Sequence, residues 1–201
     1  MSQTLYVMRH GETLFNRLRR VQGFADSPLT EHGIGQCRAA GERLRALGLS
    51  FDLHCSSTSE RACDTLEHVM GALYGEVRPY ERMRGLKEFN RGIFEGEPLY
   101  LMPTDREVRR TFFTDYGGEG DDEALERFRR TVTAVMRRGP ERALAVSHGG
   151  VGSLFYRDVT GEDEVVPGRR GVPNCAVIAY EFDAASGAFS CVDKILPDPE
   201  A

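Results

Sequence analysis

The sequence predicts an α/β fold, a three-layer α/β/α sandwich around a mostly parallel central sheet. Three observations lead to this prediction. Short apolar runs alternate with longer segments whose apolar residues recur at helical spacing. Two of the runs lead into a histidine followed by glycine, at residues 9–11 and 147–150. Glycine and proline gather in one stretch, residues 90–120. We therefore expect a single domain over residues 1–201, with residues 90–120 inserted as a small lid over the site.

Short apolar runs mark the strands of the predicted sheet. The first has apolar side chains suited to both faces of a buried parallel sheet. Two late runs, residues 177–182 and 189–195, flank the turn-forming residues 184–187 and are predicted to close the sheet as a strand pair. The other expected strands are residues 5–8, 51–55, 77–80 and 143–146.

Longer segments between these runs are predicted to be helices. Thr30, Ser59, and either Asp121 or Asp122 stand where an N-cap is needed, because their side-chain oxygens can accept from free backbone N–H groups. The polar residues 17–28 are expected to form a loop ahead of the first helix. We expect helices between residues 30 and 48, 59 and 73, 105 and 113, 121 and 139, and 151 and 159.

Composition excludes several classes of protein. The formal net charge of −5 argues against a general nucleic-acid binder. No apolar run reaches transmembrane length, and the first 14 residues lack the apolar core of a signal peptide. The five cysteines form no Cys-x-x-Cys pair or zinc pattern, which favours reduced, mostly buried thiols. We expect a cytoplasmic monomer or homodimer with neither nucleic acid nor membrane as a partner.

Two histidine motifs follow predicted strands. Arg9, His10 and Gly11 come after the first run, and His148 and Gly149 come after the run that ends at residue 146. In open α/β sheets, ligands bind at the carboxyl ends of the strands. A phosphoryl group carries about −1.5 to −2 charges near neutral pH, so its site needs preorganised cations and donors. Histidine and arginine at this edge indicate a phosphate site with a histidine nucleophile.

These motifs belong to a longer ordered pattern, through which the chain resembles the histidine phosphatase superfamily, the phosphoglycerate mutase-like proteins. An Arg-His-Gly triplet alone is a weak signal, whereas the ordered set is specific and runs nearly from end to end. The resemblance implies a phosphoglycerate mutase-like form of the predicted fold. The matching positions are residues 9–13, Asn16, Gln22, Gly23, residues 26–30, Gly33, Gln36, Ser56, Ser57, Arg61, Ala62, Thr65, Glu88, Gly92, Glu95, Gly96, residues 147–151 and Asn174.

The resemblance implies that His10 becomes phosphohistidine, a covalent intermediate that divides the reaction into two steps. The attacking ring nitrogen must be unprotonated, and neighbouring arginines favour that form. The resemblance also implies that Glu88 protonates the leaving oxygen and later deprotonates water. Register with Gly92 and Gly96 selects Glu88 over the nearby glutamates. No metal is expected, because arginines and the second histidine neutralise the charge that Mg²⁺ handles elsewhere.

Arginines are expected to hold the phosphoryl oxygens. Arg9 and Arg61 can each make forked guanidinium contacts, and His148 can complete the cradle. A histidine without such a pattern is more often a packing residue, and an arginine such as Arg61 is more often a solvated residue on a helix. Their places within the pattern favour the site. The substrate-binding residues that the resemblance implies are Asn16, Gln22, Gly23 and Gly149.

Residues 88–96 favour a phosphatase. The segment closes with Glu-Gly, as in the phosphatase branch, and lacks the Tyr before the first Gly and the Leu-Asn-Lys after the second that mark the mutase branch. We predict a metal-independent phosphatase for a small phosphorylated metabolite, with no cofactor. The alternative is a phosphoglycerate mutase with a 2,3-bisphosphoglycerate primer, faintly favoured by Arg109 and Arg110. A non-catalytic phosphate-binding regulatory protein is a minor alternative.

Overall fold

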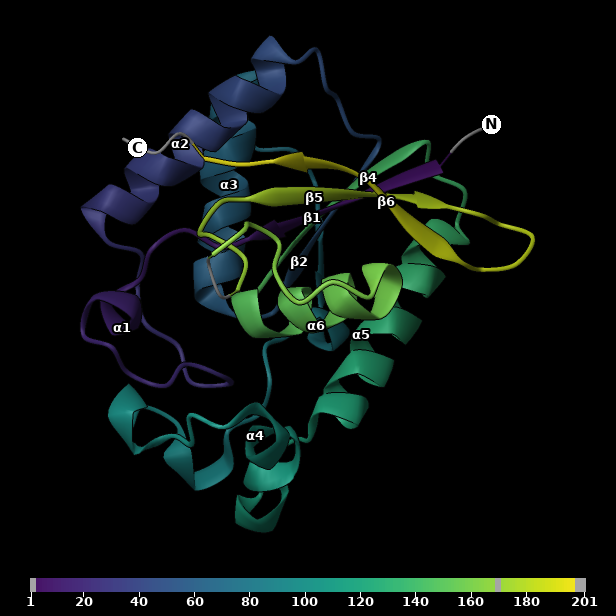
Figure 1. The fold of residues 1–201 in the computed structure, drawn as a ribbon. Coiled ribbons are helices and arrows are strands. Elements are labelled where there is room, and N and C mark those ends of the chain that lie inside the picture. Colours follow the sequence, from purple (N-terminus) through teal and green to yellow (C-terminus); the bar gives the residue numbers. More distant parts are fainter. Residues whose placement is uncertain (1–2, 169–170, 198–201) are drawn as a thin grey trace.

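A six-stranded sheet lies at the centre of the fold in the computed structural model, which describes residues 3–168 and 171–197 (Figure 1). Its strand order is β3-β2-β4-β1-β5-β6. Strands β1 to β4 pair in parallel, whereas β5 is antiparallel to both of its neighbours. The predicted α/β fold with a mostly parallel sheet is thereby confirmed. The strands are β1 (Gln3–Arg9), β2 (Leu53–Ser57), β3 (Glu81–Met83), β4 (Arg142–Ser147), β5 (Val177–Phe182) and β6 (Phe189–Ile195).

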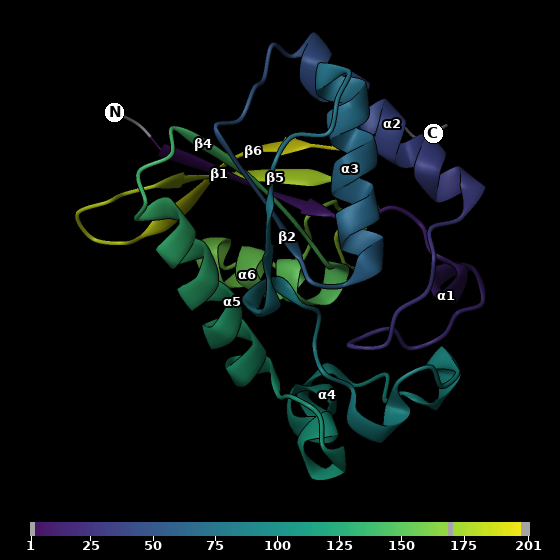
Figure 2. The ribbon, with the colours of Figure 1, turned by 180° about the vertical axis from the view of Figure 1, so that it is seen from behind.

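Helices cover both faces of the sheet. Helices α2 and α3 pack on one face and α5 and α6 on the other, as Figures 1 and 2 show from opposite sides. In β1, Leu5 and Val7 point into one apolar core and Met8 into the other, because successive side chains alternate across a strand. No helix within the described ranges is long and apolar enough to cross a membrane. The helices are α1 (Leu14–Arg17), α2 (Glu31–Ala46), α3 (Glu60–Tyr74), α4 (Arg106–Phe112), α5 (Asp121–Met136) and α6 (Gly149–Thr160), with a 3-10 turn η1 (Arg84–Leu86).

Residues 90–120 extend beyond the carboxyl edge of the sheet, in the teal part of Figure 1. They hold α4 and three 3-10 helices, η2 (Gly92–Phe94), η3 (Leu99–Leu101) and η4 (Phe113–Tyr116). A separate small core joins this segment to the loop after α1, with Val21, Met102 and Phe113 buried together. The insertion is therefore packed against the loop that follows the first histidine motif.

The third strand lies at residues 81–83, so its prediction at residues 77–80 is wrong. The apolar signal in the predicted run was misleading, since Val77 is 55% exposed. Strand β3 is instead an edge strand with the sequence Glu-Arg-Met. Edge strands carry charged residues because one side has no partner strand, and a search for apolar runs passes over them.

One prediction of a helix cap also fails, and one short helix was missed. The N-cap of α5 is Gly120, whose φ of −83° and ψ of 168° are extended, and neither Asp121 nor Asp122 caps it. Both aspartates lie in the first turn, where their charges face the positive end of the helix dipole. Helix α1 was not predicted at all. It is four residues long and is held by a capping box between Thr13 and Asn16.

Candidate active site

The pairing of two central strands brings His10 and His148 together. Arg9 and Ser147 are partners in the parallel ladder between β1 and β4, so each histidine is the next residue after its strand. The His10 backbone N–H donates to the Ser147 carbonyl at 3.0 Å. The two rings lie edge to face, with centroids 5.3 Å apart. The carboxyl edge of the sheet therefore holds both predicted histidines in contact.

His10 has one ring nitrogen committed and one free for chemistry. Its Nδ1 lies 2.8 Å from the Gly11 carbonyl oxygen, which can only accept, so Nδ1 carries the proton and Nε2 keeps its lone pair. The ring is 4% exposed. Burial and the guanidiniums of Arg61 and Arg9 lower the pKa of His10 well below its ordinary value. A neutral ring with an unprotonated Nε2 has the lone pair that a nucleophile needs.

His148 is held neutral by the opposite tautomer. The Arg61 guanidinium donates to Nδ1 at 3.0 Å, so Nδ1 has no proton, and Nε2–H donates to the Ser57 hydroxyl at 2.8 Å. Burial, with Arg61 next in effect and further contributions from His10 and Arg9, lowers the pKa of His148 well below its ordinary value. Both ring nitrogens of His148 are thus bonded inside the protein.

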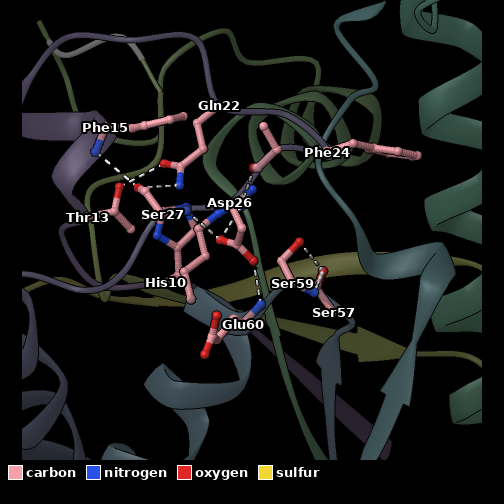
Figure 3. Close-up of polar contacts among 12 residues, drawn as sticks. His10, Thr13, Phe15, Gln22, Phe24, Asp26, Ser27, Ser57, Ser59 and Glu60 are labelled. Carbon is pink, nitrogen blue, oxygen red and sulfur yellow. Dashed lines mark hydrogen bonds and ion pairs between the residues drawn. The ribbon is translucent and has the colours of Figure 1, made fainter. Parts of the chain in front are cut away.

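Arg61 is a fully buried cation that fastens helix α3 to the loop after α1. Its Nη1 donates to the Asp26 carboxylate at 2.8 Å and to the Ala25 carbonyl at 2.9 Å. Its Nη2 donates to the Gly23 carbonyl at 2.8 Å and to His148. Figure 3 shows that Asp26 also accepts a hydrogen bond from the Glu60 backbone N–H at the start of α3. Only Nε of Arg61 has no partner within the described ranges.

The loop that carries Gln22 and Gly23 is held from two sides. Gln22 accepts from the Thr13 hydroxyl at 2.7 Å and donates to the Ser27 hydroxyl at 3.0 Å (Figure 3). On the other side, the Glu95 carboxylate accepts backbone N–H bonds from residues 23, 24, 25 and 91. A Cβ on Gly23 would lie 2.1 Å from the Phe89 carbonyl oxygen, so only glycine fits.

Glu88 sits against the N-terminus of α6. Its Oε2 accepts from the Gly150 N–H at 2.7 Å, and its Oε1 accepts from the Val151 N–H at 2.9 Å and the Phe89 N–H at 3.0 Å. A Cβ on Gly150 would lie 2.6 Å from Oε1, so the approach of the carboxylate depends on glycine there. Glu88 is 7% exposed. This helix end therefore orients the carboxylate that the sequence selected.

Arg127 and Glu119 support the Glu88 segment, and sequence reasoning missed both. The Arg127 guanidinium donates to the carbonyls of Gly85, Lys87 and Glu88 at 2.9 to 3.1 Å. It also forms an ion pair with Glu119 at 2.8 Å. In the sequence Arg127 looks like a solvated helix residue. The only available signal was the unusual position of Glu119 between two glycines.

Asn16 and Asn174 lie beside His10. The Asn174 Nδ2 group donates to the His10 carbonyl at 2.9 Å and to the Asn16 Oδ1 at 3.3 Å. The Thr13 backbone N–H also donates to this Oδ1 at 3.3 Å. With its oxygen committed, Asn16 keeps its Nδ2 group as the donor for a ligand.

A cavity of about 680 Å³ joins most of the predicted site residues. Its size falls within the usual range for small-molecule sites. Arg61, Gly23 and His148 are not among its lining residues and stand behind it. On its far side Arg9 donates to the Val172 carbonyl at 2.6 Å. Predicted residues that line the cavity are Arg9, His10, Asn16, Gln22, Glu88 and Gly149.

Cavities of this kind often hold a metal, but no group of three or more His, Cys, Asp or Glu suited to one occurs in residues 3–168 and 171–197. The polar lining consists instead of guanidiniums, amides, hydroxyls, one histidine and carboxylates. Such a set suits an oxyanion that is bound by hydrogen-bond donors.

Comparison with known proteins agrees with this geometry. The sequence profile of the histidine phosphatase superfamily (branch 1) matches residues 5–193. The chain belongs to that superfamily. This confirms the resemblance described above, including the phosphoglycerate mutase-like character of the fold.

Some relatives of this histidine phosphatase superfamily member are named as mutases, and others are named as phosphatases. It is 32% identical over 182 residues to a probable phosphoglycerate mutase, GpmB, of Erwinia tasmaniensis, covering 86% of this chain and 82% of the relative. A phosphoglycerate mutase structure from Bacillus anthracis matches with a TM-score of 0.83 at 25% identity, over 96% of this chain and 92% of the other. A putative α-ribazole-5′-P phosphatase structure from Escherichia coli matches with a TM-score of 0.74 at 25% identity, over 98% and 97%.

Proposed function

We propose that this protein is a metal-independent phosphatase, which hydrolyses a small phosphomonoester in the cytoplasm through a phosphohistidine at His10. The observation that carries the proposal is the neutral His10 ring, with its proton on Nδ1 and its Nε2 lone pair free beside a large cavity. No cofactor takes part, and the protein acts as a monomer or homodimer. The substrate is a small phosphorylated metabolite.

In the first step His10 takes the phosphoryl group. Arg9, the Asn16 amide and the Gly149 N–H hold its oxygens, while the Nε2 lone pair forms the N–P bond. The P–O bond to the alcohol breaks, and Glu88 gives the departing oxygen its proton. Arg61 and His148 stand behind this site. For His148 to touch the phosphate, it would have to exchange a present hydrogen bond for one to a phosphate oxygen, whereas Arg61 still has its Nε as a donor.

In the second step water takes the phosphoryl group from His10. Glu88, now a carboxylate, removes a proton from the water as its oxygen attacks phosphorus, and the N–P bond breaks. Inorganic phosphate leaves, and both His10 and Glu88 return to their starting forms. A cavity of about 680 Å³ has room for water beside the phosphorylated ring, and access of water distinguishes a phosphatase from a mutase.

A phosphoglycerate mutase is the second candidate, favoured by the names of several relatives. It would use the same His10 and Glu88 but return the phosphoryl group to a phosphoglycerate. Residues 88–96 argue for the phosphatase, because they follow the Glu-Gly ending of that branch.

Steady-state kinetics with EDTA present tests the proposal. The substrates are p-nitrophenyl phosphate and 3-phosphoglycerate, the latter with and without 2,3-bisphosphoglycerate primer. We expect phosphate release without formation of 2-phosphoglycerate. Primer-dependent interconversion of the phosphoglycerates would overturn the proposal in favour of the mutase. Failure to release phosphate from any of a panel of phosphomonoesters would overturn it in favour of a non-catalytic protein.

A further inference from the structure

Arg91 points an uncommitted guanidinium into the cavity that contains His10. Its guanidinium carbon lies 4.4 Å from the ring centroid of Phe89 and 4.5 Å from that of Phe113, so two aromatic faces hold it in place. It lines the cavity and is partly buried. Within residues 3–168 and 171–197 this guanidinium has neither an ion pair nor a hydrogen bond. An arginine fixed in this way is preorganised to bind an oxyanion with its forked donors.

Three other arginines of the cavity wall already have partners, which sets Arg91 apart from them. Each of the three has a carboxylate or a carbonyl within reach and therefore has less to offer a ligand. These contacts join Arg20 to the Gly96 carbonyl at 2.7 Å, Arg106 to Asp163 at 2.6 Å, and Arg157 to Asp121 at 3.6 Å.

The surroundings of Arg91 leave its charge only partly compensated. Burial lowers its pKa from the ordinary value, Glu88 acts in the opposite direction, and the positive charge of Arg109 lowers the pKa further. Arg109 also lines the cavity. Glu95 and Asp121 oppose this effect of Arg109 on Arg91. An anionic group bound between the two arginines would stabilise both charges further.

The position of Arg91 shows which part of a substrate it would meet. It follows Glu88 by three residues, and Glu88 is the carboxylate with the greatest electrostatic influence on it. In the proposed mechanism Glu88 protonates the leaving oxygen. Arg91 therefore stands beside the leaving alcohol. Apolar side chains of Met102, Phe113 and Leu154 line the same cavity and suit a short carbon chain.

We propose that the substrate has a second oxyanion, a carboxylate or a phosphate, on its leaving alcohol, and that Arg91 binds it. This rests on the proposed phosphatase function and narrows its substrate class. Arg91 is then a specificity-determining residue: it binds an oxyanion that is not transferred. A guanidinium gives up this contact when the anion is replaced by a neutral group of the same shape, which makes the proposal measurable.

Matched substrates provide the test. One is 2-carboxyethyl phosphate, the second is its carboxamide twin, and the third is the bisphosphate of 1,3-propanediol. The quantity measured is the ratio of kcat/KM for each anionic substrate to that for the carboxamide, in the wild type, Arg91→Gln, Arg91→Lys and Arg106→Gln. The carboxamide reports any loss that Arg91→Gln causes through folding or through Glu88, so the ratio isolates anion recognition. Arg106→Gln is the control, because Asp163 already neutralises that arginine.

We expect the wild type to prefer at least one anionic substrate by about 10- to 100-fold, as for a charge-assisted hydrogen bond. Arg91→Gln should bring that ratio close to one, Arg91→Lys should retain part of it, and Arg106→Gln should change it by less than about threefold. Comparison of the ratios for the carboxylate substrate and the bisphosphate substrate shows whether Arg91 binds a carboxylate or a phosphate.

Equal ratios in the wild type and Arg91→Gln would overturn the proposal and leave Arg91 as a neighbour that balances the charge of Glu88. A wild-type ratio near one, with p-nitrophenyl phosphate still hydrolysed, would overturn it while the phosphatase function stands. Absence of turnover on every substrate, p-nitrophenyl phosphate included, would instead contradict the phosphatase function itself.

Discussion

The His10 tautomer is set by a single backbone carbonyl. Because the Gly11 oxygen can only accept, the ring proton stays on Nδ1, and the nucleophilic nitrogen faces away from this bond. No sequence pattern can predict this choice, since it depends on the direction of a peptide group after the strand ends. The motif predicted which residue would react, and the structure adds which of its ring nitrogens has a free lone pair.

Replacing His10 tests its proposed role as the nucleophile. We expect His10→Ala to lose more than about 1000-fold in turnover while its circular dichroism spectrum is unchanged, because no other group can form the covalent intermediate. Brief mixing with a ³²P-labelled substrate, followed by an alkaline quench, should label the wild type and leave the variant unlabelled. Normal turnover by the His10→Ala variant would contradict the proposed mechanism.

Glu88→Ala should affect substrates unequally. An alkyl alkoxide needs a proton as it leaves, whereas p-nitrophenolate hardly does. The variant should therefore lose far more activity on an alkyl phosphate than on p-nitrophenyl phosphate. The measurement is kcat/KM for both substrates in both proteins. Equal losses would count against Glu88 as the acid and would indicate a role in packing against α6.

At the scale of elements, one carboxylate organises the loop over the site. Glu95 accepts four backbone N–H bonds, three of them from successive residues of the loop that holds Arg61 by its carbonyls. The loop thus owes its shape to a residue more than 70 positions away along the chain.

Removing this carboxylate should loosen the loop without unfolding the protein. We expect Glu95→Ala to lower kcat/KM by about tenfold or more, with the melting temperature reduced by only a few degrees. Glu97→Ala is the matched control, since Glu97 is exposed and two positions along the chain. Faster trypsin cleavage within residues 17–28 should accompany the loss. Equal activity in the two variants would rule out this account of the loop.

Buried strands were predictable, whereas several short or polar elements were not. The strands β1 and β4 are continuous apolar runs, because helices cover both faces of the sheet there, and the two histidines follow them directly. Strand β3 is short and polar, α1 is a single turn, and the N-cap of α5 is a glycine without a side-chain oxygen. The position of β3 depends on pairing with β2, which is distant in the sequence.

The same distinction divides the candidate site. His10 and Glu88 belong to local motifs, and the sequence indicated both. Arg127 holds the Glu88 segment through three carbonyls some 40 positions away, a relation visible only after folding. His148 was expected to face a phosphate, yet its ring nitrogens are bonded to Arg61 and Ser57. Residue types indicated the chemistry, but not which donors remain available.

For the whole molecule, two buried neutral histidines connect stability to pH. The pKa values of His10 and His148 lie well below those of the unfolded chain, about 6.5. Below that pH the histidines bind protons in the unfolded state but stay unprotonated in the folded state. The free energy of unfolding that they contribute is therefore fully present above about pH 6.5 and falls as the pH drops below it. Each histidine contributes a slope of up to about 1.4 kcal/mol per pH unit.

Urea unfolding at pH 7.5, 6.5 and 5.5 measures this slope. The double variant His10→Asn, His148→Gln should lose most of it, although His54, whose pKa burial also lowers, keeps a part in both proteins. The exposed His32→Gln variant is the control and should keep the wild-type slope. An unchanged slope in the double variant would contradict the link between these histidines and acid sensitivity.

The ladder between β1 and β4 has a consequence for how the protein can change. Because hydrogen-bonded backbone spaces the two histidines, their separation does not depend on how well the side chains of either core fit together. Substitutions in the two cores can therefore reduce thermal stability long before they misalign the reacting groups. The segments that carry Asn16, Gln22 and Arg91 can diversify around two histidines of constant spacing, so one scaffold can acquire new ligands by accumulating changes that leave this pair intact.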